Sequence, residues 1–222
     1  MRRASNLAID RKTINEVLTM GYSHVTGNPL VPDTFEFYWQ PPAPVYDPAQ
    51  ARQLLAAAGY PNGFDAGSYN CDTSFANTAE AVVNNLGEVG IRTRLRPVER
   101  AGFLMAFAEK AYKNVIQAQP GAFGNAATRL ESHAAQGGTF TYGSYPDLDA
   151  LFQQQAGELN YQRREAILHQ MQQIVIERMI YAPIWQYAFI SGVGPRVAES
   201  GFGRIPGFAY TAPYDELALK EG

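Results

Sequence analysis

The side chains best suited to contact a ligand follow one predicted strand, residues 114–119. They carry amide, aromatic and guanidinium groups, and they are Gln117, Gln119, Phe123, Asn125 and Arg129. Amide and guanidinium groups donate hydrogen bonds, and the glycines at positions 121 and 124 let the backbone approach a bound molecule closely. In α/β sheets, ligands bind beyond the carboxyl ends of the strands. The pattern therefore predicts either a ligand-contacting turn or an ordinary strand-to-helix turn in which Asn125 caps the helix.

A second candidate for ligand contact is the segment 184–187, where two large rings, Trp185 and Tyr187, flank an amide. Aromatic rings line ligand clefts, but they also pack in protein cores, so both interpretations stay open. Tyr142 is a weaker candidate of the same kind.

Residues that could carry catalysis or bind a metal show no recognisable pattern. The three histidines, His24, His133 and His169, have no His, Cys or paired acid at ligand spacing, so we expect no metal site. Cys71 is the only cysteine, which excludes an internal disulfide, and we expect it to be buried and structural. The sequence contains no nucleophile elbow, phosphate-binding loop or dinucleotide fingerprint. We therefore expect neither an enzyme nor a cofactor.

The composition is that of a folded domain in which the numbers of basic and acidic residues are nearly equal. Apolar residues make up 46% of the 222 positions, and 18 basic and 21 acidic residues give a net charge of −3. This balance predicts no nucleic-acid partner. Arg92, Arg94 and Arg96 form a basic row, which we interpret as the solvated face of a strand. No segment has the roughly 18 consecutive apolar residues that cross a bilayer, and the N-terminus lacks the apolar core of a signal peptide.

The first regular elements can be placed from periodicity and caps. Residues 2–9 form a short predicted helix, and Asp10 caps a second helix that ends at Gly21. Residues 22–46 contain several prolines and predict an extended connection. Asp47 and Pro48 then open a third helix, which Gly59 closes.

The remainder alternates between strands and helices. Predicted strands cover 64–70, 91–96 and 114–119, and predicted helices cover 75–89 and 99–111. Further helices follow at 147–157 and 161–179, and a last strand at 181–190. From Gly192 onward the periodicity fades. This order predicts an α/β fold with a mixed sheet.

Several segments resemble the bacterial extracellular solute-binding proteins of the peptide/nickel ABC importer family, family 5. Residues 3–11 resemble its R-x-A-x-x-x-A-I-D-R segment, and residues 46–60 are similar to its Y-D-P-x-x-A-x-x-L-L-x-x-A-G-Y motif. The L-x-x-x-G-I turn at 86–91, the Y-x-x-x-P-x-x-D stretch at 142–149 and the segment from Arg163 to Ile184 follow in the family's order.

The resemblance implies a periplasmic-binding-protein-like lobe of the type II architecture, with a mixed central sheet flanked by helices. In the family, the segment like residues 3–11 lies past the middle of the chain. We therefore expect residues 1–190 to be the C-terminal lobe and residues 191–222 a tail that returns to an N-terminal lobe. We also expect a signal peptide ahead of that missing lobe, and a periplasmic location.

The implied function is non-catalytic capture of a solute, an oligopeptide or similar small polar molecule, by closure of two lobes, followed by delivery to the membrane permease of an ABC importer. In peptide-binding members, an Asp in the segment like 117–125 pairs with the ammonium group of the peptide. Residues 117–125 contain no acid here. This difference from the family pattern favours a solute that is bound by neutral hydrogen-bond donors and acceptors.

Two other classes of function stay open on the sequence. A relative of the binding proteins can act as a sensory, chaperone or other interaction module without transport, and it would share the fold. A hydrolase built on Ser144 or His169 is the less favoured alternative.

Overall fold

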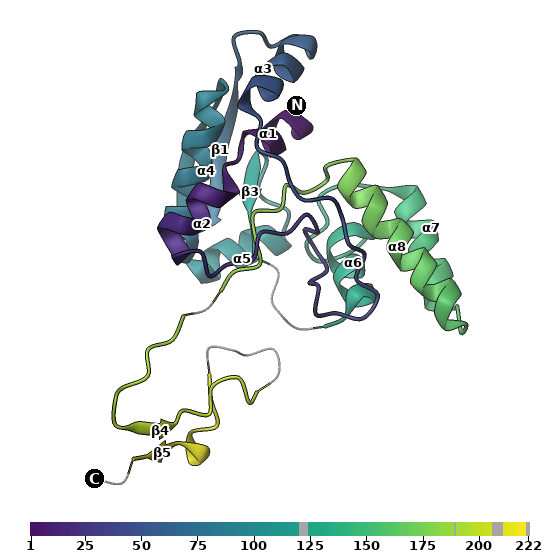
Figure 1. Cartoon of the computed structure of the whole chain (residues 1–222). Coiled ribbons are helices and arrows are strands. Elements are labelled where there is room, and N and C mark those ends of the chain that lie inside the picture. The colour runs from purple at the N-terminus through teal and green to yellow at the C-terminus, as the bar shows by residue number, and fades with distance from the viewer. Residues whose placement is uncertain (120–123, 189, 206–210, 221–222) are drawn as a thin grey trace.

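A three-stranded parallel sheet organises the chain (Figure 1). The computed structural model describes residues 1–119, 124–188, 190–205 and 211–220. Strand β1 (Phe64–Asp72) lies between β2 (Ile91–Val98) and β3 (Val115–Gln117), and both pairings are parallel. The mixed α/β class with a central sheet and flanking helices is as expected, although the described strands of this sheet are all parallel rather than mixed in direction.

Crossover segments join the parallel strands, as this arrangement requires. The 3₁₀ turn η1 (Thr73–Phe75) and helix α4 (Ala76–Glu88) lead from β1 to β2, and α5 (Arg100–Ala108) leads from β2 to β3. The three strands therefore end at the same edge of the sheet, where η1 follows β1 and α5 follows β2.

Strand β1 contains an irregularity in its pairing with β2, between Asp65 and Ser68. Gly67 adopts a φ of +77°, and a Cβ at this position would overlap the side-chain amide of Asn114. Only glycine suits both the backbone conformation and the space.

Three helices precede the sheet in sequence: α1 (Arg2–Ala8), α2 (Arg11–Thr19) and α3 (Pro48–Ala57). The predicted caps are confirmed, because Asp10 accepts a hydrogen bond from the backbone N–H of Thr13 and Asp47 accepts one from that of Gln50. The connection over residues 22–46 contains no helix and only a single bridge residue, as predicted.

The main core lies between the sheet and helices α1–α4. Tyr69 and Cys71 of β1 and Ile91 of β2 are buried there, together with Val82 and Leu86 of α4. These β1 and β2 residues alternate with polar ones such as Asn70 and Arg92, so one face of the sheet is apolar. The expected buried position of Cys71 is confirmed.

A second core forms among α6 (Ala126–Ala134), α7 (Pro146–Ala156) and α8 (Tyr161–Glu177). The extended connection packs on it through Leu30 and Val31. The side chain of Gln172 on α8 is fully buried and fixes this connection. Its Nε2 donates to the carbonyl oxygen of Phe37 at 2.8 Å, and its Oε1 accepts from the backbone N–H of Trp39 at 3.0 Å and from Asn28 Nδ2 at 2.8 Å.

The strand predicted over 181–190 is wrong for the residues that the structure describes. Only Gln186 pairs, through one antiparallel bridge with His24. Pro183 cannot donate a ladder hydrogen bond, which shortens any pairing in this segment.

Beyond this segment, residues 191–205 and 211–220 lie away from the body of the molecule (Figure 1). Their strands β4 (Val197–Glu199) and β5 (Ala218–Leu219) are antiparallel, and the 3₁₀ turn η2 (Tyr214–Glu216) precedes β5. Among the described residues, no helix combines the length and the apolar character needed to cross a membrane.

Candidate functional site

The carboxyl ends of the three parallel strands place several polar side chains at one edge of the sheet. Asp72 ends β1 and is paired in register with Val98, the last residue of β2, while Gln117 ends β3 and is paired with Cys71. Glu99 and Arg100 follow β2 directly. Since the ends of parallel strands form the usual ligand-binding edge of an α/β sheet, we take this edge as the candidate site.

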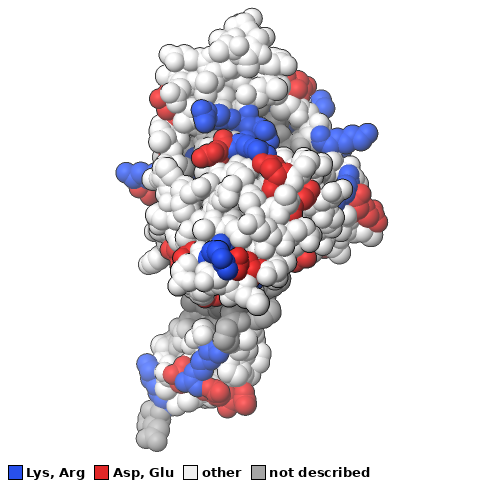
Figure 2. Space-filling view, turned by 90° about the vertical axis from the view of Figure 1, so that its right-hand side faces the viewer, with Lys and Arg blue, Asp and Glu red and all other residues white. Residues whose placement is uncertain are grey.

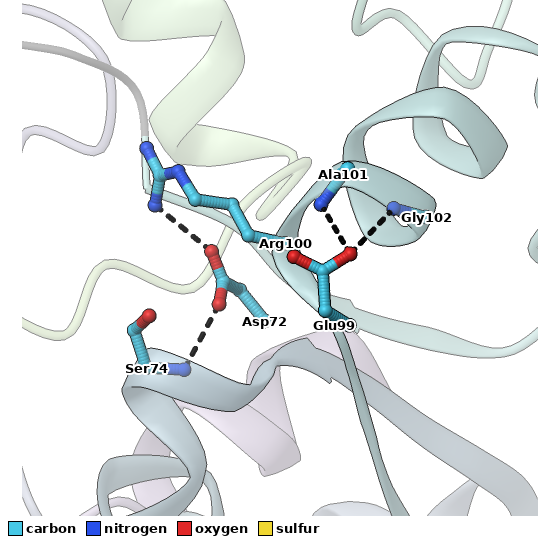
Figure 3. Close-up of polar contacts among 6 residues, drawn as sticks. All are labelled: Asp72, Ser74, Glu99, Arg100, Ala101 and Gly102. Atoms are coloured by element: carbon cyan, nitrogen blue, oxygen red, sulfur yellow. Dashed lines mark hydrogen bonds and ion pairs between the residues drawn. The ribbon is translucent and has the colours of Figure 1, made fainter.

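An ion pair between Asp72 and Arg100 joins the ends of β1 and β2 (Figure 3). Arg100 Nη1 donates to Asp72 Oδ2 at 2.9 Å, and the backbone N–H of Ser74 donates to Asp72 Oδ1 at 2.9 Å. The Asp72 side chain is 6% exposed, whereas the Arg100 side chain is 62% exposed. The carboxylate is therefore a buried anchor that holds a guanidinium facing solvent.

Glu99 lies beside this pair, and its carboxylate binds the backbone of the helix that follows it. Its carboxylate accepts hydrogen bonds from the backbone N–H groups of Ala101 at 3.0 Å and Gly102 at 3.4 Å, and so it caps α5 (Figure 3). A carboxylate at a helix N-terminus is stabilised by the helix dipole and by the unpaired N–H groups. The charge of Glu99 is thus directed to the backbone of α5.

Gln117 has a fixed orientation at the end of β3. The hydroxyl of Tyr69 donates to Gln117 Oε1 at 2.8 Å, and burial raises the pKa of Tyr69, which keeps this hydroxyl protonated. The amide oxygen of Gln117 is therefore occupied, and its NH₂ group is the end suited to donate to a ligand. Gln119, two residues further, is exposed. Phe123 lies outside the described residues.

Asn125 and Arg129 have structural partners in the described part of the chain. Asn125 caps α6 through a reciprocal pair with Thr128, so the interpretation of this segment as a helix cap is confirmed. The Arg129 side chain is buried, and its Nε donates to the carbonyl oxygen of Leu30 at 2.9 Å. Burial lowers the pKa of Arg129 to about 10. Their proposed contact with a ligand stays a prediction.

The two rings of the second candidate segment lie beside the turn that follows β1. Tyr187 meets Phe75 of η1 edge-on, with ring centroids 5.7 Å apart, and its centroid lies 6.5 Å from that of Trp185. Trp185 also packs against the main core. The packing of Trp185 on the core agrees with one of the two interpretations of this segment, whereas Tyr187 is partly exposed. Contact of either ring with a ligand stays a prediction.

Tyr142 lies apart from this edge. Its hydroxyl donates to the carbonyl oxygen of Phe107 at 3.2 Å, and Phe107 belongs to the last turn of α5, whose first turn is at the edge.

A hollow of about 280 Å³ lies on the polar face of the sheet. Its lining residues are Ser68, Asn70, Arg96, Val98, Ala111, Tyr112, Lys113 and Asn114.

In the part of the chain that the structure describes, no cluster of three or more His, Cys, Asp or Glu side chains could hold a metal. The Nε2 of His169 is buried and has no hydrogen-bond partner among these residues, so it is not paired with Ser144 there. Figure 2 shows basic and acidic side chains interspersed on one face of the molecule, rather than one extended basic area.

Comparison with known proteins decides the family. The model of the bacterial extracellular solute-binding proteins, family 5 Middle, matches residues 1–156. The chain belongs to this family. The family 5 chain is 27% identical to heme-binding protein A of Haemophilus influenzae over 96% of its own length and 40% of that protein. It is 31% identical to the glutathione-binding protein GsiB of Pectobacterium atrosepticum, over 45% of its own length and 20% of that protein.

A solved structure supports the fold of this family 5 chain. The periplasmic binding protein DppA of Helicobacter pylori, in complex with the peptide STSA, superimposes with a TM-score of 0.73 at 22% identity. The match covers 83% of this chain and 38% of that one. The family and the fold are those of non-catalytic solute-binding proteins. The chain spans less than half the length of the relatives it matches.

The sequence pattern missed three residues of this edge: Asp72, Arg100 and Phe75. Of the three predicted strands of this sheet, only 114–119 precedes residues that the sequence marks for ligand contact. Applied to the predicted strands 64–70 and 91–96 as well, the rule about carboxyl ends would have indicated the residues that follow each of them.

Proposed function

We propose that this chain is the C-terminal lobe of a two-lobed receptor that captures a small polar solute and delivers it to the permease of an ABC importer. The match of residues 1–156 to the family model is the observation that carries this proposal. Closure of two lobes around a solute is a hinge motion, and it breaks no covalent bond in the solute. The importer and the periplasmic location follow from the family and belong to the same proposal.

The candidate edge supports solute binding. It combines the guanidinium of Arg100, the amide of Gln117 and the ring of Tyr187, which come from three separate segments. A few convergent polar groups next to aromatic surface are typical of small-molecule sites. The names of the relatives mention heme, glutathione and a peptide, which differ in size and shape. We propose an oligopeptide or a similar small polar molecule as the solute here.

The tail supports the two-lobed arrangement. Large apolar side chains are exposed along its described residues, namely Val193, Phe202, Tyr214, Leu217 and Leu219. Burial of such side chains contributes about 1.5–3 kcal/mol each, so an exposed series is typical of a surface that packs on another body. We propose that residues 191–222 return to the N-terminal lobe, and that residues 1–190 form the C-terminal lobe.

A comparison of two proteins tests the proposal. The two-lobed protein and the 222-residue chain are each purified, freed of ligand by unfolding and refolding, and titrated with free-acid tripeptides, glutathione, heme and neutral sugars. We expect the two-lobed protein to bind at least one of these and the single lobe to bind it far more weakly, because half of the site is missing. Equal affinity of the two proteins would contradict the two-lobed site, and a two-lobed protein that binds none of these solutes would contradict the receptor function.

A further inference from the structure

The hollow of about 280 Å³ lies on the polar face of the sheet rather than at the edge that the strand ends form. It is lined by Ser68 and Asn70 of β1, by Arg96 and Val98 of β2, and by residues 111–114, which lead into β3. Among these lining residues, only Val98 also ends a strand. Pockets for drug-sized ligands have volumes of about 300–1,000 Å³, so this hollow is suited to a smaller molecule.

The irregularity in β1 gives the hollow its shape. Gly67 lies within this irregularity, and its φ is +77°. A Cβ on Gly67 would overlap the side-chain amide of Asn114, so the glycine lets residues 111–114 approach β1 closely. Irregularities of this kind re-aim the side chains of a strand, and they are common beside functional sites.

Two basic side chains from different segments line this hollow. Arg96 belongs to β2, and Lys113 lies ahead of β3, on the other side of β1. Neither forms an ion pair with a residue that the structure describes. Basic residues on an edge strand discourage pairing with another chain, which is a sufficient reason for Arg92 and Arg94. It is no reason for a lysine of another segment at the same hollow.

The neutral polar groups of the lining have unused hydrogen-bonding capacity. The hydroxyl of Tyr112 is buried and has no partner among the described residues. Asn70 is buried, and its Nδ2 donates to the carbonyl oxygen of Val115 at 3.1 Å, which uses one of its two N–H groups. Buried polar groups are nearly always hydrogen-bonded, so an unpartnered hydroxyl beside a hollow favours a polar molecule there.

The acidic residues that flank this part of β1 are bound elsewhere. Asp65 accepts a hydrogen bond from the backbone N–H of Gly67 at 2.7 Å, and Asp72 is paired with Arg100. The lining itself contains no acidic residue. Two like charges at one hollow repel each other, and an anion from solution would offset this repulsion.

We propose that the hollow binds a small phosphate-bearing anion through Arg96 and Lys113, with Tyr112 and Asn70 as neutral donors. A phosphate group carries about 1.5–2 negative charges at neutral pH and has three strong acceptor oxygens. This combination matches two cations and two neutral donors that approach from separate segments. The inference does not depend on the proposed function, since the hollow and the candidate edge are different surfaces.

The test is a calorimetric titration of the 222-residue chain, in phosphate-free buffer of constant ionic strength, with inorganic phosphate, glycerol 3-phosphate and acetate. We expect saturable binding of inorganic phosphate or of glycerol 3-phosphate, and no binding of acetate at the same concentrations. Whichever phosphate compound binds more tightly identifies the source of the group. In Arg96→Gln and in Lys113→Gln the affinity should fall about 10- to 100-fold, because each variant loses a charge-assisted hydrogen bond.

Two further variants make the test specific. Arg92→Gln removes an exposed arginine of the same strand that lies outside the lining, and it should retain the affinity. Tyr112→Phe removes only the unpartnered hydroxyl. It should therefore keep or raise the stability of the free chain while it weakens phosphate binding about 3- to 10-fold.

Several outcomes would overturn the inference. They are the absence of saturable binding of both phosphate compounds, equal binding of acetate, an unchanged affinity in Arg96→Gln and Lys113→Gln, or the same loss in Arg92→Gln. Circular dichroism of each variant confirms that it is folded. If one of the two lining variants does not fold, the other decides. A titration of this single lobe without any peptide leaves the proposed receptor function standing in every case.

Discussion

Arg11 Nε donates a hydrogen bond to the carbonyl oxygen of Pro183 at 2.6 Å, and so joins two residues that are 172 positions apart in the chain. The same buried guanidinium donates to the carbonyl oxygens of Asn6 and Ile9. Burial lowers its pKa to about 10, so it stays charged at neutral pH. Pro183 lies two residues before Trp185, which means that Arg11 fixes the approach of the aromatic segment to the candidate edge.

Replacement of this arginine should destabilise the fold. In Arg11→Met the carbonyl oxygens of Asn6, Ile9 and Pro183 lose their donor inside the protein, at a cost of about 2–3 kcal/mol in the free energy of unfolding. Urea denaturation followed by circular dichroism measures the loss. Arg3→Met on the exposed side of α1 is the control and should change the stability by less than about 0.5 kcal/mol. An equal effect of the two substitutions would contradict the role of Arg11.

Gln172 should be as important for the second core. Gln172→Leu keeps the volume of the side chain roughly constant but leaves Asn28, Phe37 and Trp39 without a buried partner. We expect a loss of about 2–3 kcal/mol in unfolding free energy and faster proteolysis within residues 22–46. The control is Gln170→Leu on the exposed face of α8. A cleavage pattern that is the same in both variants would show that Gln172 does not hold the connection.

His133 should make the stability depend on pH. Burial, and then the charge of Arg129, lower its pKa from 6.5 to about 4 in the folded protein. Because the unfolded chain takes up the proton first, stability from this residue is fully present above pH 6.5 and is lost as the pH falls from 6.5 toward 4, by about 3 kcal/mol in total.

Urea titrations between pH 4 and pH 7 measure this dependence. His133→Gln should flatten the curve in that range, whereas His24→Gln, at an exposed histidine, should leave it unchanged. A wild-type curve that is already flat between pH 4 and pH 6.5 would show that His133 is readily protonated in the folded state.

Two glycines should respond in opposite directions to alanine. Gly67→Ala introduces a Cβ against the side chain of Asn114 at a φ of +77°, so we expect a loss of at least about 1 kcal/mol. Gly87→Ala lies inside α4 with open space around it, and there alanine should stabilise the protein by about 0.5–1 kcal/mol. Thermal denaturation of both variants measures the difference, and a loss of similar size at both positions would contradict the special conformation of Gly67.

Trp185 should report the binding of a solute. The chain contains two tryptophans, Trp39 and Trp185, and Trp185 lies beside Tyr187. In the two-lobed protein, Trp39→Phe should retain the change in fluorescence that a bound tripeptide causes, and Trp185→Phe should lose it. Loss of the signal in Trp39→Phe instead would move the binding site away from the candidate edge.

Local sequence signals were sufficient for most of the helices. Asp47 followed by Pro48 specifies a helix start through two independent effects, a side-chain cap and a preset φ, and the structure has α3 there. The alternation of Ile91, Thr93 and Leu95 with arginines likewise specified β2 and its buried face.

No local sequence pattern predicted which residues far apart in the chain pair with each other. The segment 181–190 has the composition of a strand, but a strand needs a partner, and only Gln186 finds one in His24. The pairing of Asp72 with Arg100 spans 28 residues and depends on β1 and β2 being adjacent and in register. Gln172 is a polar residue on an otherwise apolar face, and its burial follows only from the path of residues 28–39 across α8.

Because β1, β2 and β3 run in one direction, the residues that hold the sheet together lie apart from the residues at its open end. Substitutions just after Asp72, Val98 and Gln117 can change the surface of this edge while Cys71, Ile91 and Leu86 keep packing as before. The chemistry of this edge can therefore vary at a few positions while the core keeps its contribution to the free energy of folding.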